Sequence, residues 1–129
     1  MSLRTPLGRV LGMGSAKEGT GHWWAQRVTA VASIPLTLWL FFSLLFLPGL
    51  DYGTVRTWLA LPTSSFLAAL TVAVLTYHSY LGTTVVIEDY VPSAAMKVFS
   101  LMLLRFLYVL VGGAGIFAIL RVAFGSSGP

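Results

Sequence analysis

The stretch VTAVASIPLTLWLFFSLLFL, residues 28–47, runs for 20 amino acids without a charged side chain. A helix needs about 20 apolar residues to cross a hydrocarbon core about 30 Å thick, so this run has the length of one membrane crossing. Residues 58–87 also lack a formal charge, and residues 98–120 carry a single one, at Arg105. We therefore expect an all-α membrane protein with three transmembrane helices, at about residues 28–47, 62–87 and 95–121.

Prolines and glycines indicate where these helices bend and end. Pro35 lies inside the first run and predicts a local kink, because proline lacks the backbone N–H that a helix interior uses. Pro48 and Gly49 should end that helix, and the polar residues 51–56 have the composition of a turn. Pro62 is suited to begin the second helix, since proline is tolerated in a first turn. The helices should then form one anchor domain over 28–124, between an N-terminal segment, 1–27, and a short tail, 125–129.

The overall composition excludes several classes of protein. Of the 129 residues, 57% are apolar and only 9% are charged, whereas about a quarter are charged in an ordinary soluble domain. The formal net charge is +4, but the eight basic residues are spread among long apolar runs and form no basic face for nucleic acid. The chain has no cysteine, which excludes disulfides, iron–sulfur clusters and thiolate ligands. Any bound metal must therefore be held by histidine or oxygen.

The basic residues predict the orientation in the membrane, because the side richer in Lys and Arg usually stays in the cytoplasm. With three crossings, the N-terminal segment and the second connection share one side of the membrane. That side holds Arg4, Arg9, Lys17, Arg27 and Lys97, whereas the opposite side holds Arg56 and Arg121. We therefore expect a cytoplasmic N-terminus and a periplasmic C-terminus.

His78 is an ionisable residue in the middle of an apolar run, and such residues often mark functional sites in membranes. On a helix it shares a stripe about 40° wide with Thr71, Gly82 and Asp89. Eleven residues separate it from Asp89, a rise of about 16 Å that places it near the bilayer centre. A neutral imidazole there suits the axial ligation of haem iron, and Gly82 would let a flat group approach. Alternatively, His78 forms a hydrogen bond across a helix interface and Gly82 only permits close packing.

The other candidate residues lie nearer the helix ends. His22 is the second of two histidines and sits at the membrane interface, so a six-coordinate haem on His78 would need its other ligand from another chain. Asp89 and Tyr90 lie where a lipophilic quinone would present its head group, although acids and tyrosines are also common at a membrane surface. Arg27 can either extend to lipid phosphate or pair with a haem propionate.

Two features of the third run have no assigned ligand. Arg105 should lie partly inside the hydrocarbon, where it either extends to the nearer surface or meets an acidic residue of another subunit. The small residues Gly112, Gly113 and Gly115 should allow close packing against another helix.

Two motifs resemble the small hydrophobic anchor subunit of succinate dehydrogenase, respiratory complex II. One is the run from His78 through Gly82 to Asp89-Tyr90-Val91, and the other is Gly21-His22-Trp23-Trp24-Ala25-Gln26-Arg27-Val28-Thr29-Ala30. The resemblance implies that His78 is an axial ligand of one haem b, whose other ligand comes from a larger cytochrome b anchor subunit. It implies that Tyr90 and Asp89 line a ubiquinone pocket under the iron–sulfur subunit. It also places Arg27 and His22 near the haem propionates.

The resemblance further implies a chain that catalyses nothing alone. It would anchor a flavoprotein subunit and an iron–sulfur subunit to the bacterial inner membrane, as a multi-pass protein packed against the larger anchor and lipid. Electrons from succinate oxidation would pass to ubiquinone at the anchor interface. A competing interpretation is a haem-free structural or assembly subunit without a redox role. A proton-coupled transporter is disfavoured, because all four acidic residues lie at helix ends or in connections.

Overall fold

Four helices make up most of the computed structural model, which describes residues 5–6 and 16–125. They are α2 (Ala16–Leu45), α3 (Tyr52–Ala60), α4 (Pro62–Tyr90) and α5 (Ala94–Phe124). The described part of the chain contains no strand. Three segments are long and apolar enough to cross a membrane, namely Gly19–Leu45, Pro62–Tyr90 and Ala94–Phe124. The predicted all-α chain with three such helices is confirmed.

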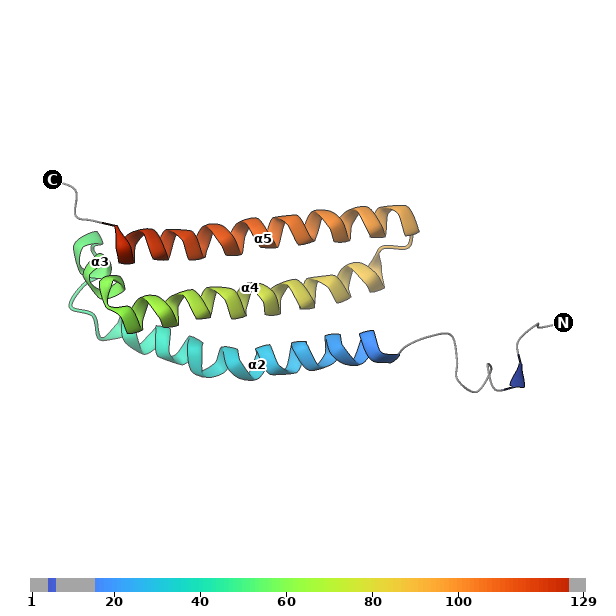
Figure 1. Ribbon diagram of the computed structural model, residues 1–129, viewed down its shortest axis with the longest axis horizontal. Coiled ribbons are helices and arrows are strands. Elements are labelled where there is room, and N and C mark those ends of the chain that lie inside the picture. Colours follow the sequence, from blue (N-terminus) through green and yellow to red (C-terminus); the bar gives the residue numbers. More distant parts are fainter. Residues whose placement is uncertain (1–4, 7–15, 126–129) are drawn as a thin grey trace.

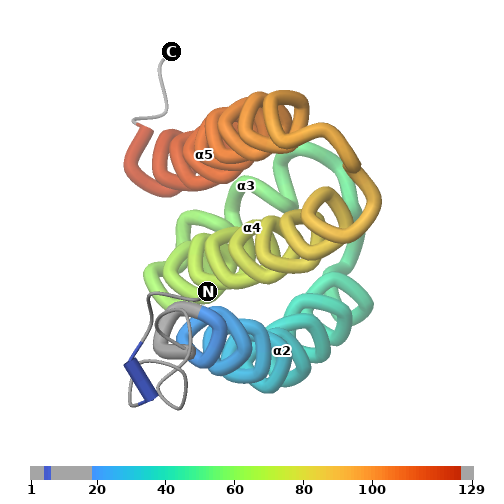
Figure 2. Tube along the Cα trace, turned by 90° about the vertical axis from the view of Figure 1, so that its right-hand side faces the viewer, coloured from blue at the N-terminus to red at the C-terminus, as the bar shows by residue number. Residues whose placement is uncertain are grey.

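The three long helices lie in one curved layer with α4 in the middle (Figures 1 and 2). Within the described residues, α2 packs on α4 and α4 packs on α5, but α2 and α5 do not pack on each other. The start of α2 and the α4–α5 connection lie at one end of the layer, and α3 lies at the other end with the last turns of α5 (Figure 1). Both outer helices therefore depend on α4 for their position.

Helix α2 begins at Ala16, twelve residues before the apolar run at Val28. Residues 16–27 contain polar side chains but no proline, so the hydrogen-bond ladder can start in the polar segment. The helix continues through Pro35 and is bowed along its length (Figure 1). The apolar run therefore marks only the part of α2 that is suited to lipid, and the helix itself begins earlier, in the polar segment.

The connection that the sequence suggested to be a polar turn contains helix α3. Asp51 caps this helix, because its carboxylate accepts hydrogen bonds from Thr54 Oγ1 at 2.7 Å and Thr54 N at 3.1 Å. Both hydrogen bonds hold the pKa of Asp51 below its ordinary value, and the bond from the Thr54 hydroxyl has the larger effect. Trp58 of α3 stacks on Trp39 of α2, with 5.7 Å between the ring centroids. The short helix is thus fixed at its start by a cap and near its end by an aromatic contact.

The contacts between the helices consist largely of small and polar side chains. The buried polar residues are Thr29, Ser64, Ser65, Thr71 and Thr84, and the buried apolar ones are Leu36, Ala68, Leu81 and Leu104. Most large apolar side chains point outward instead, among them Phe41, Phe66 and Phe106. Such an arrangement is typical of membrane helices, in which small residues let the backbones approach and large ones face lipid or other subunits.

Candidate functional site

His78 lies at the interface between α4 and α2, half-buried. Its Nδ1 atom is 3.0 Å from Oγ1 of Thr29, a buried residue of α2. The same Thr29 hydroxyl lies 2.7 Å from the Ala25 carbonyl oxygen and 3.2 Å from that of Gln26. No described residue forms a hydrogen bond to Nε2 of His78. One ring nitrogen is therefore held by this chain, and the other is open to a ligand from outside it.

Gly82 lies one helical turn from His78, and the packing of this chain does not require a glycine there. A Cβ atom at Gly82 would meet only Nε2 of Gln26, at the ordinary contact distance of 3.8 Å. By contrast, a Cβ at Gly112 or Gly115 of α5 would lie 3.0 Å from a side-chain carbon of α4. Gly112 and Gly115 therefore permit close packing of α5 on α4, whereas Gly82 leaves space beside His78.

His22 and Gln26 bring two further polar atoms to this face of α2. Nε2 of His22 and Oε1 of Gln26 are buried and have no hydrogen-bond partner within the described residues. With Thr29 they follow the spacing of four and three residues that forms one stripe along a helix. Buried polar atoms usually have a partner, so this stripe is suited to a polar group supplied from outside the chain.

Arg27 does not join this group. Its guanidinium carbon lies 5.4 Å from the centre of the Trp23 ring, and both side chains are exposed. Thr29 follows Arg27 by two positions, a turn of about 200°, which places them on nearly opposite sides of α2. The structure thus places His22 on the same side of α2 as Thr29, and Gly82 one turn from His78, but leaves Arg27 on the outer surface.

Asp89 and Tyr90 form the last residues of α4, about 16 Å along the helix axis from His78. Both are exposed, and 81% of the Tyr90 surface is accessible. Neither side chain forms a hydrogen bond or an ion pair with another described residue. This end of the chain is open, so a closed binding pocket here needs residues from other subunits.

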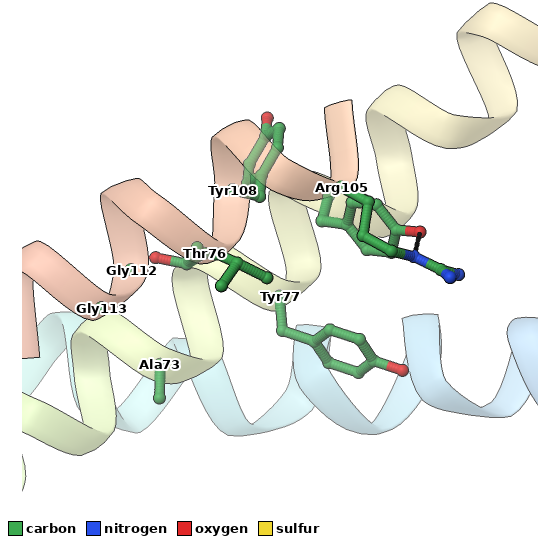
Figure 3. A pocket seen from close by; sticks show the side chains of 9 residues that line it. Ala73, Thr76, Tyr77, Arg105, Tyr108, Gly112 and Gly113 are labelled. Atoms are coloured by element: carbon green, nitrogen blue, oxygen red, sulfur yellow. Dashed lines mark hydrogen bonds between the residues drawn. The ribbon is translucent and has the colours of Figure 1, made fainter. Parts of the chain in front are cut away.

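Arg105 has a partner inside the chain, in place of the membrane surface or the acidic residue of another subunit expected from the sequence. Its Nε atom donates to the Tyr80 hydroxyl at 3.3 Å, on the outer side of the α4–α5 pair (Figure 3). Nearby, Tyr108 and Thr83 share a hydrogen bond of 3.0 Å. Tyr80, Arg105 and Tyr108 line an open hollow of about 460 Å³, whose lining also includes Ala73, Gly112 and Gly113. The hollow lies on the side of α4 away from α2, so it is separate from the His78 face.

Two residues of the site, Thr29 and Gln26, were absent from the sequence-based set of candidates. Their signal was the polar stripe itself, since His22, Gln26 and Thr29 recur at helical spacing ahead of an apolar run. The described residues contain no group of three or more His, Cys, Asp or Glu side chains that could hold a metal ion. The donor available in the middle of α4 is a single imidazole.

Comparisons with known proteins agree with this arrangement. Residues 1–112 match the family described as succinate dehydrogenase/fumarate reductase transmembrane subunit. The chain is 35% identical over 109 residues to the succinate dehydrogenase hydrophobic membrane anchor subunit of Rickettsia bellii. The aligned region covers 77% of this chain and 86% of that relative. It is 30% identical over 122 residues to the subunit of that name from Paracoccus denitrificans, which covers 95% and 94%.

A third relative is similar over a shorter stretch. The succinate dehydrogenase membrane anchor subunit of Reclinomonas americana is 33% identical over 92 residues, or 69% of this chain and 77% of that protein. The resemblance that the sequence motifs indicated is therefore confirmed, and the chain belongs to the family of succinate dehydrogenase and fumarate reductase transmembrane subunits.

Proposed function

We propose that this chain is the small hydrophobic anchor of a bacterial succinate dehydrogenase, and that it helps to bind one haem b and ubiquinone. The relatives named above support the role of anchor, which is that of a non-catalytic subunit in an oxidoreductase complex. The observation that carries the haem assignment is the state of His78. One nitrogen of its ring bonds to α2 and the other is open beside Gly82.

The residues around His78 fit a haem. Nε2 of His78 would supply the imidazole donor that holds the haem iron. Gly82 leaves room for a planar ring, and the partnerless atoms of His22 and Gln26 lie toward the same helix interface. Arg27 is available to a propionate only from the outer side of α2. When bound, the haem supplies a one-electron redox centre inside the membrane.

Asp89 and Tyr90 are proposed to serve ubiquinone at the end of α4. A phenol hydroxyl can donate a hydrogen bond to a quinone carbonyl, and an adjacent carboxylate can hold a proton for the reduced quinone. Both groups are exposed and free of partners among the described residues, which leaves them available. The larger cytochrome b anchor and the iron–sulfur subunit would close the pocket, with the flavoprotein subunit beyond them.

The haem assignment is tested by a reduced-minus-oxidised visible spectrum of the complex purified through a tag on this chain. We expect a b-type signal in the wild type that is lost in His78→Ala. Gly82→Ala should weaken or shift the signal, because the added methyl group would occupy the space proposed for the haem; the chain itself accommodates that methyl group. Gly113→Ala is the control, since a Cβ there meets nothing within 4 Å, and it should match the wild type.

An absence of any haem signal, with succinate-to-quinone activity intact, would contradict the haem assignment. The chain would then be a haem-free structural anchor. A normal signal in His78→Ala would instead show that the ligand lies elsewhere.

A further inference from the structure

The contact between Thr29 and His78 determines more than the packing of two helices. A threonine hydroxyl carries one proton and can also accept hydrogen bonds. In this structure Oγ1 of Thr29 lies 2.7 Å from the Ala25 carbonyl oxygen, which can only accept. Two oxygens at that distance need a proton between them. The Thr29 proton is therefore committed to Ala25.

This commitment fixes the proton on the neighbouring histidine. Because the Thr29 proton points to Ala25, its oxygen meets Nδ1 of His78, 3.0 Å away, as an acceptor. Nδ1 must then carry the ring proton, and in a neutral imidazole Nε2 keeps its lone pair. We infer that Thr29 is the positioning residue that selects this tautomer of His78, and so makes Nε2 the nitrogen that binds haem iron.

Burial makes this bond effective. Thr29 is 9% exposed, so water does not compete for the contact. Threonine in a helix has few χ1 rotamers, and the bond to Ala25 restrains the hydroxyl further. An acceptor on the far nitrogen of a ligating histidine also orients the ring and makes it a stronger donor. A stronger donor favours iron(III), so the Thr29 hydroxyl should lower the midpoint potential of the haem.

The inference rests on the proposed haem assignment, and its test separates the two. The purified complex is titrated spectroelectrochemically to obtain the midpoint potential of the haem, and its oxidised form is examined by EPR. Thr29→Val removes the hydroxyl and keeps the branched shape, so the potential should rise and the EPR g-values should move. Thr29→Ser keeps the hydroxyl and should stay near the wild type.

The chain offers a matched control in Thr84. This residue is also 9% exposed, and its hydroxyl donates to the Tyr80 carbonyl at 2.8 Å, much as Thr29 donates to Ala25. It lies on the side of α4 that faces α5, near Leu101 and Arg105, and it has no contact with His78. Thr84→Val should therefore leave the potential and the g-values unchanged.

Each outcome has one reading. A shifted potential in Thr29→Val, or loss of its haem, supports the inference when Thr29→Ser and Thr84→Val retain the wild-type spectrum. Should Thr29→Val fail to assemble, Thr29→Ala removes the same acceptor without adding a methyl group in its place. A potential and g-values identical to the wild type in the hydroxyl-free variant overturn the inference and leave the haem assignment standing. A wild-type complex without haem overturns both.

Discussion

Tyr90 is an exposed tyrosine whose hydroxyl has no partner among the described residues, and 81% of its surface is accessible. Tyr90→Phe should therefore leave the fold intact while removing the proposed bond to the quinone. We expect succinate-to-ubiquinone turnover to fall on the order of tenfold, the effect of one lost hydrogen bond. Reduction of a water-soluble dye, which takes its electrons upstream, should stay unchanged.

Tyr52 provides the matched control for that variant. It is 76% exposed and lies in α3, at the opposite end of the layer. Tyr52→Phe should retain full quinone turnover. Equal turnover in both variants and in the wild type would remove Tyr90 from the quinone site.

Single residues differ in how far the sequence reveals them. His78 stands out because an imidazole in a long uncharged run is rare, and that signal needs no knowledge of the fold. Thr29 could not be assigned in the same way, since its partner lies 49 residues away. The contact depends on the register of α2 against α4, and the sequence of either helix alone does not specify that register.

The pairing of α4 with α5 depends on glycines at particular positions. A Cβ at Gly112 would lie 3.0 Å from Cγ2 of Thr76. Gly112→Ala should therefore loosen this helix pair by about 1–3 kcal/mol through overpacking, offset by up to about 1 kcal/mol from the better helix propensity of alanine. The thermal stability of the purified complex measures the net effect.

A second substitution makes that test specific. Thr76→Ser removes Cγ2, the atom nearest the added methyl group, so the Gly112→Ala, Thr76→Ser double variant should recover much of the lost stability. Gly113→Ala, which meets no atom within 4 Å, should cause no loss. Equal losses at Gly112 and Gly113 would show that contacts outside this chain, and not the α4–α5 packing, set the effect.

Hydropathy predicted the three long apolar helices but not the short helix α3. Helix α3 is short and amphipathic, and it depends on the Asp51 cap and on the stacking of Trp58 against Trp39. The same residues, Asp51 and Gly53 among them, also suit a turn. The contact with Trp39 of α2 favours the helix over the turn, and the sequence pattern of residues 51–60 alone does not reveal that contact.

The orientation of the whole molecule in the membrane can be tested directly. Lys97 lies in the first turn of α5, at the end that carries the α4–α5 connection, whereas Arg56 in α3 and Arg121 in the last turn of α5 lie at the other end. The chain has no native cysteine, so single cysteines report cleanly. In intact spheroplasts, Thr57→Cys in α3 should react with a membrane-impermeant maleimide.

Ser93→Cys, in the α4–α5 connection, is the companion variant. It should react only after the membrane is opened, because that end is predicted to face the cytoplasm. Both serine and threonine are exposed at these positions, which keeps the comparison even. The reverse pattern of labelling would invert the proposed orientation and move the quinone end to the periplasm.

The central place of α4 has a consequence for biosynthesis. Helix α2 leaves the ribosome first, yet its main packing surface, α4, is made later in the chain. Until then His22, Gln26 and Thr29 have no helix of this chain to cover them. Within this chain α2 therefore has no long helix to pack on until α4 is made, and the contact between Thr29 and His78 forms only after α4 has joined α2.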